Sequence, residues 1–240
     1  MRIPRDASRL WKFFYVLLTI LKPLLCRLRI EGAEHIPATG GCIIASNHSM
    51  GPDYVILGYA SSRQIYYMAK IELFRIHPLL SKFLNTVGAF PINRGQTDIE
   101  ALNAAESLLE RGKVLGMFPE GTRSRTGELR RGKTGAVRLA MKTQTPVVPA
   151  AVIDGEAIFT RLGRRPEVIV RFGPPLYPTG DSSHKTLPRD QTDLVMHAIA
   201  QLLPPERRGI YGKPKVEPAP NLMATSVEVA GETETADNNS

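Results

Sequence analysis

Two residues five positions apart, His48 and Asp53, are the pair in this sequence best suited to proton transfer. Both lie in the segment SNHSMGPDYV (residues 46–55). On a continuous helix their side chains would point about 140° apart. The Gly51-Pro52 step between them removes this difficulty, because proline favours the first position of a helix. We therefore expect a helix from Pro52, with Asp53 in its first turn and His48 in a loop that folds back towards it.

Paired in this way, the carboxylate of Asp53 accepts one ring N–H and holds the imidazole in a single tautomer, which leaves the other nitrogen free as a base. Such a base typically contributes about 10²–10⁴ in rate. The alternative is that Asp53 only complements a helix dipole and His48 is an incidental loop residue. Ser49 lacks a G-x-S-x-G elbow and Cys42 opens an apolar run, so neither resembles a nucleophile. The pattern predicts direct transfer to a hydroxyl that the substrate carries.

A second cluster, FPEGTRS (residues 118–124), follows another apolar run. Gly121 lets the backbone approach a ligand closely, and Arg123 offers a planar set of donors that suits phosphate. Glu120 could orient Arg123 or accept a hydrogen bond from a substrate hydroxyl. The cluster predicts an anion-binding loop at the end of a strand, where α/β sheets bind ligands.

Two more cationic residues each come directly after a short apolar run. Lys70 ends the run IYYMA, and Arg94 lies in GAFPINRG (residues 88–95). A single basic residue of this kind is more typical of a solvated surface. Together with Arg123, however, these positions predict a phosphate clamp.

The segment GELRRGKT (residues 127–134) also fits the P-loop spacing G-x-x-x-x-G-K-[ST]. A phosphate-binding P-loop follows its strand at once, but here nine residues separate Phe118 from Gly127. The positions between the glycines hold Leu129 and two arginines, where close approach to phosphates favours small residues. We interpret the match as coincidental, and we expect neither nucleotide binding nor nucleotide hydrolysis.

The elements that must position these residues alternate along the chain. Apolar runs predict strands at residues 42–46, 65–69, 114–118, 147–153 and 168–172. Periodic segments predict helices at residues 52–60, 78–86, 97–111, 134–143 and 187–203. The fold class predicted is α/β, with a mixed, largely parallel sheet flanked by helices.

The charge composition limits the kinds of partner that this protein can bind. The net charge is +8, and the last thirty residues hold only two lysines against five acidic side chains, so the basic excess lies in the rest of the chain. An excess of this kind indicates an anionic partner. No nucleic-acid-binding motif is present, so an anionic membrane or a phosphorylated substrate is favoured and nucleic acid is not expected. Two cysteines suggest a reducing compartment, and no metal-ligand spacing occurs.

The amino-terminal run LWKFFYVLLTILKPLLCRLRI (residues 10–30) has the pattern of an interfacial helix. Polar and cationic residues share one side of a helical wheel, namely Arg5, Ser8, Arg9, Lys12, Tyr15, Thr19 and Lys22. Apolar side chains fill most of the rest, as in a helix lying among lipid headgroups. The apolar stretch is shorter than the roughly 20 residues of a spanning helix. A core helix and a true membrane span are the alternatives, and a cleaved signal peptide is not expected.

These patterns divide the chain into three parts. Residues 1–29 are expected to be a helical segment that associates with a membrane, and residues 30–203 a single α/β domain. Residues 204–240 are rich in Pro, Glu and Thr and are expected to form a disordered tail.

Four blocks in order resemble a known family. NHSMGPD matches an N-H-x-x-x-x-D motif, GAFPINR a second block, FPEGTRS a third, and TPVVPAAV (residues 145–152) a fourth. Over residues 30–178 the chain resembles the glycerolipid acyltransferases, in particular the lysophosphatidate acyltransferases. The resemblance also accounts for the basic loop and the helix that follow the third block.

The resemblance implies a role for each block. His48 would deprotonate the acceptor hydroxyl, and Asp53 would orient His48. The glycerol phosphate would be bound by Lys70, Arg94 and Arg123, in a seat shaped by Glu120, Gly121 and Thr122. Pro149 would be structural, on the acyl-donor side. Backbone amides near His48 or Gly121 would stabilise the oxyanion.

The resemblance also implies the reaction and its place. An acyl group would pass from acyl-CoA or acyl-carrier protein to lysophosphatidate, which gives phosphatidate, with no further cofactor. Another lysophospholipid, a glycolipid or glycerol phosphate is the alternative acceptor, and a non-catalytic lipid-binding module is the alternative class. The protein would work at the cytoplasmic face of the cell membrane, attached peripherally rather than by a span.

Overall fold

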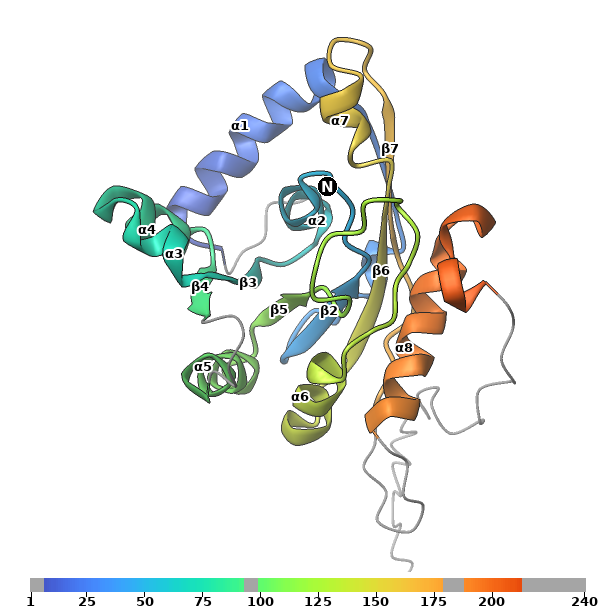
Figure 1. Ribbon diagram of the computed structural model, residues 1–240. Coiled ribbons are helices and arrows are strands. Elements are labelled where there is room, and N and C mark those ends of the chain that lie inside the picture. The colour runs from blue at the N-terminus through green and yellow to red at the C-terminus, as the bar shows by residue number, and fades with distance from the viewer. Residues whose placement is uncertain (1–6, 93–98, 179–187, 213–240) are drawn as a thin grey trace, which may run out of the picture.

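The computed structural model describes residues 7–92, 99–178 and 188–212 (Figure 1). Within these ranges a single sheet of seven strands forms the centre of the fold. Its strands are Arg27–Glu31 (β1), Cys42–Ser46 (β2), Ile65–Lys70 (β3), Ala89–Ile92 (β4), Val114–Met117 (β5), Val147–Ile153 (β6) and Glu167–Phe172 (β7).

The strands lie in the order β1-β7-β6-β2-β5-β3-β4. All neighbouring pairs are parallel except β6 and β7, which confirms the predicted mixed, largely parallel sheet. The carboxyl ends of β2, β3, β5 and β6 consequently share one edge of the sheet. Because β7 runs against β6, its amino end lies at that same edge.

Helices cover both faces of the sheet (Figure 1). They are Arg9–Leu25 (α1), Asp53–Ala60 (α2), Ile71–Arg75 (α3), Pro78–Thr86 (α4), Ile99–Glu110 (α5), Gly135–Thr143 (α6), Ala157–Thr160 (α7) and Pro188–Leu202 (α8). Short 3₁₀ turns occupy Ala33–His35 (η1), Pro205–Arg207 (η2) and Gly209–Tyr211 (η3). All five predicted strands and all five predicted helices occur, with ends shifted by two residues or fewer within the described residues.

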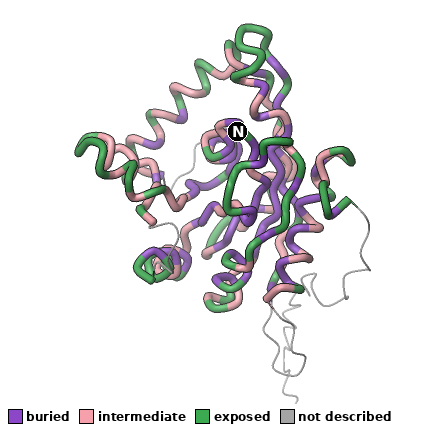
Figure 2. The backbone as a smooth tube through the Cα atoms, viewed as in Figure 1, coloured by how far each residue is buried: buried purple, intermediate pink, exposed green. Residues whose placement is uncertain are grey.

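The core has one layer on each side of the sheet, because successive residues of a strand point to opposite faces. Ile43 and Ala45 of β2 face α5, α6 and α8, whereas Cys42 and Ile44 face α2. Burial is continuous along the central strands in Figure 2. The sheet is therefore a rigid support for the loops that leave its carboxyl edge.

Helix α1 packs on α2 with the side that carries its polar residues. The Ser8 hydroxyl accepts from the Trp11 amide and donates to the Thr86 carbonyl. Tyr15 stacks on Tyr59 of α2 at 4.7 Å, and the Lys22 ammonium lies 5.7 Å from the centre of the same Tyr59 ring.

The opposite side of α1 is apolar and exposed, with Phe13, Val16, Ile20 and Leu24 all pointing outwards. Ser8, Tyr15 and Lys22 of the predicted polar side thus contact the protein, whereas these four apolar residues face away from it. In the described part of the chain no helix is both long and apolar enough to cross a bilayer.

Residues 204–212 are folded, so the predicted domain end at residue 203 is wrong. The turns η2 and η3 follow α8 directly, and the Tyr211 side chain is buried in the core cluster beneath α8. The Tyr211 hydroxyl accepts from the Gly132 amide and donates to Asp193. The other predicted boundary, between residues 29 and 30, falls inside β1. The remainder of the expected tail lies outside the described residues.

Candidate active site

His48 and Asp53 meet at the carboxyl end of β2. His48 follows two residues after the strand, and Asp53 is the first residue of α2, as the Gly51-Pro52 step predicted. His48 Nδ1 lies 2.8 Å from Asp53 Oδ2. The carboxylate holds the Nδ1–H tautomer in place, so Nε2 carries the free lone pair and can accept a proton.

Asp53 is fully buried, and both of its oxygens are bonded. Oδ2 accepts from the Ser49 amide at 2.7 Å as well as from His48, and Oδ1 accepts from the Ser49 hydroxyl at 2.8 Å. These donors stabilise the charged carboxylate and fix its orientation. Ser49 is therefore a positioning residue, which agrees with the absence of nucleophile signals around it in the sequence.

Asn47 anchors the histidine loop to the neighbouring strand. Its side-chain amide donates to the Val152 carbonyl at 2.9 Å, and its side-chain oxygen accepts from the Val152 amide at 2.8 Å. The asparagine thereby takes the place of a backbone partner just beyond the last β2–β6 register pair, Ser46↔Ala150. Sequence analysis assigned Asn47 no role, although it precedes the histidine in the matched motif.

An aromatic stack supports the imidazole. The His48 ring lies on Phe118 with ring centres 4.1 Å apart and planes 17° from parallel. Phe118 also stacks on Tyr67, for which Gly116 leaves room, because a Cβ at Gly116 would come 2.2 Å from the Tyr67 ring. The Tyr67 hydroxyl is buried without a hydrogen-bond partner in the described structure. Burial, and next the nearby charge of Asp53, raise its pKa.

Glu120 connects the loop that follows β5 to the histidine. Its Oε1 accepts from the His48 amide at 2.8 Å and its Oε2 accepts from the Arg130 amide at 3.0 Å. Burial raises the pKa of this carboxyl group, and the two amide bonds oppose that effect. Both oxygens hold backbone amides, so Glu120 fixes the turn to the histidine loop, and among the described contacts it forms no ion pair with Arg123.

The residues next to Glu120 are exposed at the same edge. Gly121 has a φ of +73°, a conformation that glycine adopts at little cost. The side chain of Lys133 lies against Gly121, 2.9 Å from the position that a Cβ would take. Thr122 and Arg123 project from this turn with exposed side chains. The turn thus carries the side chains of Lys133 and Arg123 next to Glu120, whose carboxylate holds the His48 amide.

The remaining predicted site residues have three different outcomes. Lys70 is exposed at the end of β3, three residues beyond the register pair Tyr67↔Gly116 and thus level with the loop after β5. Arg94 lies outside the described residues. Pro149 is buried within β6, four residues before the strand ends, and its carbonyl accepts from the Gly173 amide. These contacts place it inside the sheet rather than at the edge with His48.

Backbone amides close to His48 are largely committed inside the protein. The His48 and Ser49 amides donate to Glu120 and Asp53, the Gly51 amide donates to the Ser49 hydroxyl, and the Gly121 amide donates to the Phe118 carbonyl. None of these four is free for the oxyanion role expected of this region.

Arg207, which sequence analysis placed in a tail, joins two loops beside the site. Its guanidinium lies 2.5 Å from Asp154 and 3.0 Å from Glu156, in the turn after β6. Its carbonyl accepts from the Leu129 amide of the loop after β5. Between the two acidic residues, Gly155 packs so closely that a Cβ there would come 3.1 Å from Asp53 Oδ1. These contacts and the burial of Tyr211 distinguish the segment from a tail, and neither has a local sequence signal.

The P-loop-like segment has different contacts from a phosphate cradle. Leu129 is buried, and its amide is bonded to Arg207 as described above. The Lys133 amide donates to the Pro119 carbonyl, and α6 begins only at Gly135. These amides are used to fold the loop back on the end of β5.

The fold and the site together define a class of protein. A His–Asp pair without an adjacent nucleophile lies at the carboxyl edge of an α/β sheet, beside a cationic turn. The family model described as "Acyltransferase" matches residues 27–153, which include the pair and the turn. The chain belongs to this acyltransferase family, which confirms the resemblance drawn from the four blocks.

Relatives and a solved structure agree with this assignment. A 1-acyl-sn-glycerol-3-phosphate acyltransferase of Bacillus subtilis is 33% identical over 169 residues, which cover 70% of this chain and 83% of the relative. An enzyme of the same name from Borreliella burgdorferi is 32% identical and covers 56% of this chain and 54% of the relative. The crystal structure of the 1-acyl-sn-glycerophosphate acyltransferase PlsC of Thermotoga maritima, 24% identical, has the same fold, with a TM-score of 0.59 over 83% of this chain and 84% of that one.

Proposed function

We propose that this protein transfers an acyl group from a thioester donor, acyl-CoA or acyl-carrier protein, to the free hydroxyl of lysophosphatidate, which produces phosphatidate for phospholipid biosynthesis. The observation that carries the proposal is the 2.8 Å contact between His48 Nδ1 and the buried Asp53 carboxylate. The names of the relatives from Bacillus subtilis and Borreliella burgdorferi support the choice of acceptor.

The reaction follows from the orientation of the imidazole. Nε2 of His48 takes the proton of the acceptor hydroxyl as its oxygen attacks the thioester carbonyl. The tetrahedral intermediate collapses, the carbon–sulfur bond breaks, and the departing thiolate takes the proton back from Nε2. Asp53 stays ionised throughout and stabilises the transient imidazolium. No covalent bond forms between the acyl group and the protein at any stage, which is consistent with the use of the Ser49 hydroxyl to hold Asp53.

The phosphate of the acceptor requires cations near the histidine. Arg123 follows Glu120, whose carboxylate holds the His48 amide, so the guanidinium is tied to the catalytic loop by a short stretch of chain. Lys70 ends the strand next to β5. We assign these two residues, with Arg94, to the phosphate, and Gly121 and Thr122 to the wall of its seat. We propose that the acceptor is a phosphorylated lysolipid for this reason.

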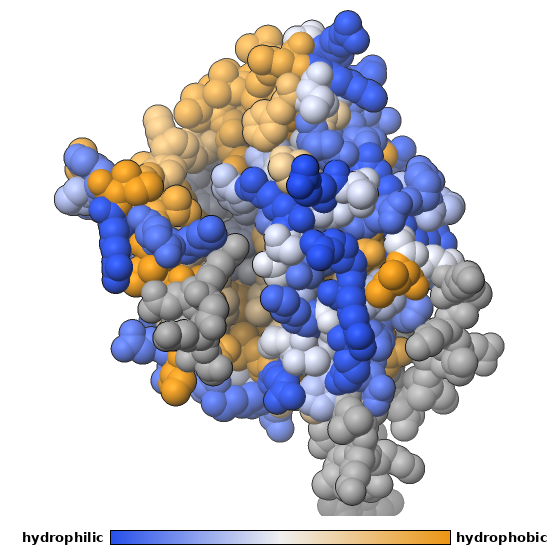
Figure 3. Space-filling model, viewed as in Figure 1, coloured by the Kyte–Doolittle hydropathy of each residue, from blue (hydrophilic) through white to orange (hydrophobic). Residues whose placement is uncertain are grey.

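The proposed acceptor is a membrane lipid, and α1 has a surface that could contact the bilayer. The exposed apolar side of α1 is continuous in Figure 3, and further exposed apolar residues lie near α3 and α4, namely Leu73, Ile76 and Leu79. A helix with such a face binds in the plane of the interface. We propose that α1 attaches the protein peripherally to the cytoplasmic face of the cell membrane.

His48→Ala tests the catalytic assignment. The purified variant in neutral detergent should transfer acyl groups at least about 10²-fold more slowly than the parent. It should bind lysophosphatidate with unchanged affinity, and His35→Ala, at a histidine away from the site, serves as the control. Unchanged turnover of the His48 variant would show that another group is the base.

A panel of acceptors tests the substrate. Lysophosphatidate, another lysophospholipid, a glycolipid and glycerol phosphate are compared with both thioester donors. We expect the highest kcat/KM for lysophosphatidate, and Arg123→Gln should raise KM for it. Equally rapid acylation of an acceptor without phosphate would refute the phosphate clamp while leaving the base assignment intact.

A further inference from the structure

A pocket of about 260 Å³ lies at the end of α1, where the helix meets the first residues of β1 and β7. Four cationic side chains line it, Lys22, Arg27, Arg29 and Arg165, together with Glu167 and the buried thiol of Cys26. In Figure 1 this is the corner where α1 ends beside the connection from α7 to β7. None of the predicted site residues belongs to it.

The pocket has more positive charge than its acidic residues neutralise. Arg29 is paired with Glu31 at 2.6 Å. Lys22 interacts with the Tyr59 ring, while Arg27 and Arg165 form no ion pair with a described carboxylate. Arg27 stands opposite Glu167 in the β1–β7 register, yet their charged groups remain apart. Three cations against Glu167 leave a site that attracts a phosphate group.

The end of α1 and the connection from α7 to β7 also expose large apolar side chains. Leu162, in the connection from α7 to β7, is exposed three residues before Arg165, and Leu24 is exposed on the outer side of α1. Phe159 of α7 is exposed as well. Apolar side chains next to cations match the boundary of a bilayer, where acyl chains meet the phosphate layer. A dissolved phosphate ion would gain nothing from them.

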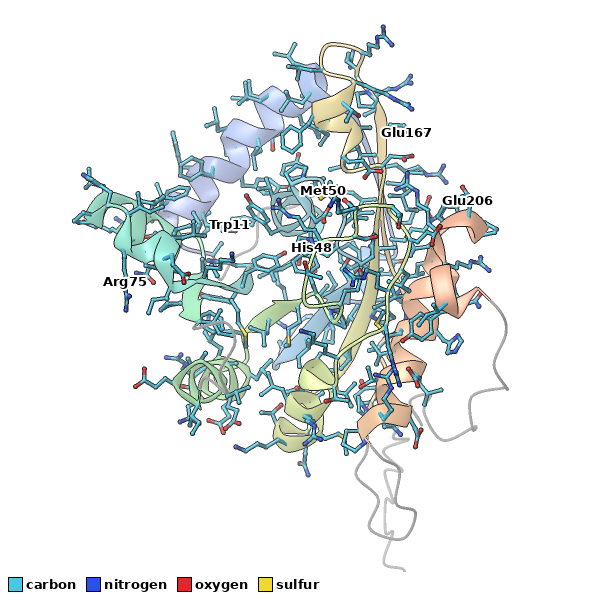
Figure 4. The ribbon with its side chains drawn as sticks, in the orientation of Figure 1. Trp11, His48, Met50, Arg75, Glu167 and Glu206 are labelled. Atoms are coloured by element: carbon cyan, nitrogen blue, oxygen red, sulfur yellow. The ribbon has the colours of Figure 1, made fainter. Side chains whose placement is uncertain are left out.

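The position of the pocket relates it to the active site. The amino end of β7 lies at the edge of the sheet where His48 lies, because β7 is antiparallel to β6. The strand order β1-β7-β6-β2 puts the start of β1 three strands from β2, about 15 Å along the sheet. Glu167 and His48 are both marked in Figure 4, at the upper end and in the middle of this side.

We propose that this pocket binds the phosphate of an anionic membrane lipid and so holds the catalytic edge of the sheet against the bilayer. This inference rests on the proposed function at a membrane. It concerns a different lipid molecule, which the protein binds but does not acylate. Arg27 and Arg165, with Lys22 on the inner wall of the pocket, hold the phosphate, and Phe159 and Leu162 enter the acyl region. The lipid binds about three strands away from the site of transfer.

The test compares two variants that lose the same charge. Arg27→Gln/Arg165→Gln removes two pocket cations, and Arg111→Gln/Lys113→Gln removes two cations before β5, at the opposite edge. Binding is measured by co-sedimentation with vesicles of phosphatidylcholine, with or without phosphatidylglycerol, and no substrate is present. On the anionic vesicles we expect the pocket variant to bind about 10-fold more weakly or worse, and the control to change less than about 3-fold. On phosphatidylcholine alone the pocket variant should bind like the parent.

Two further measurements separate the possible failures. Turnover in neutral detergent micelles should be unchanged in the pocket variant, so loss of vesicle binding with intact turnover supports a lipid site distinct from catalysis. Equal losses in both variants would mean diffuse attraction, and no loss in either would mean no site. Saturable binding of inorganic phosphate without lipid, abolished in the pocket variant, would identify a site for free phosphate and overturn the lipid assignment.

Discussion

The catalytic corner and the outer side of α1 are built on opposite principles. Around His48 every described contact is internal, since Asp53 takes three donors, Glu120 takes two amides and Asn47 bonds to β6. On α1 the polar residues Ser8, Tyr15 and Lys22 contact the domain, and several large apolar residues face outward. Phe13, Ile20 and Leu24 are 60%, 67% and 68% exposed.

The difference shows that the catalytic region satisfies its contacts within the fold, whereas the outer side of α1 requires a membrane or a partner to cover it. A base needs a fixed tautomer and a fixed position before its substrate arrives, so its hydrogen bonds must be satisfied by the fold itself. An exposed apolar stripe costs free energy in water and is removed from water by a membrane or a partner. Substitutions in the first region should therefore change kcat, and those in the second should change partitioning.

The largest expected effect is that of Asp53→Asn. An asparagine amide would donate where Asp53 now accepts from Ser49 and His48, so the imidazole would lose its tautomer and its charge partner. We expect kcat to fall by about 10²–10⁴-fold with little change in KM. Steady-state kinetics of this variant and of Asp190→Asn, on the surface of α8, give the comparison. A fall of less than about 5-fold would deny Asp53 its role.

The next effect concerns the outer side of α1. The triple variant Phe13→Ser/Ile20→Ser/Leu24→Ser should bind phosphatidylcholine vesicles about 100-fold more weakly, because each substitution removes apolar area that the membrane would otherwise bury. The melting temperature should change little, since these side chains contact water in the free protein. The matched control is Ile99→Ser/Leu102→Ser/Ile210→Ser, which removes exposed apolar residues elsewhere. Equal effects of the two triple variants would show that α1 is not the attachment surface.

The two regions also differ in how far the sequence predicted them. The His48–Asp53 pair was predictable because Gly51-Pro52 fixes the geometry over six residues. The role of Glu120 was not, because its acceptor oxygens hold backbone amides of residues 48 and 130, and only the folded loop brings these together. For α1 the wheel identified two sides, but no local signal says which of them the domain will cover.

The same limit applied to the strands. Central strands such as β2 and β6 are buried on both faces and read as continuous apolar runs. Sequence analysis missed β1, RLRIE, and β4, AFPI, which lie at the two ends of the sheet, where charged residues and proline are tolerated. Tyr211 and Arg207 were missed because the composition of this segment is rich in Pro and Glu, whereas the burial of Tyr211 and the ion pairs of Arg207 depend on distant elements.

Arg207→Ala should have a smaller effect than the triple substitution on α1, and the effect should be on kcat rather than on membrane binding. Without the guanidinium, the turn at Asp154 and Glu156 loses its ion pairs with residue 207. Gly155, which packs against Asp53 in this turn, is then no longer held in place. We expect kcat to fall by about 10-fold, because a misplacement of about 1 Å is costly to catalysis, and Arg207→Lys should restore part of it.

A purely structural role for Arg207 would leave kcat unchanged well below the melting temperature. Arg208→Ala, which removes only a bond from the Arg208 guanidinium to the Leu203 carbonyl, is the neighbouring control. Equal kcat in the two alanine variants would separate Arg207 from the positioning of Asp53.

The smallest effect tests the inner side of α1 and appears only in alkali. Burial, followed by the nearby Tyr59, raises the pKa of Tyr15 to about 12, whereas tyrosine in an unfolded chain ionises near pH 10. Between these values the unfolded chain has already lost a proton that the folded protein keeps, so stability falls as pH rises from about 10 to about 12. Urea unfolding near pH 9 and near pH 11 should show a loss about 1–2 kcal/mol larger in the parent than in Tyr15→Phe. Tyr54→Phe, at an exposed tyrosine of α2, should lose as much as the parent. If Tyr15→Phe also matches the parent, the packing of α1 on α2 does not contribute to stability as the structure indicates.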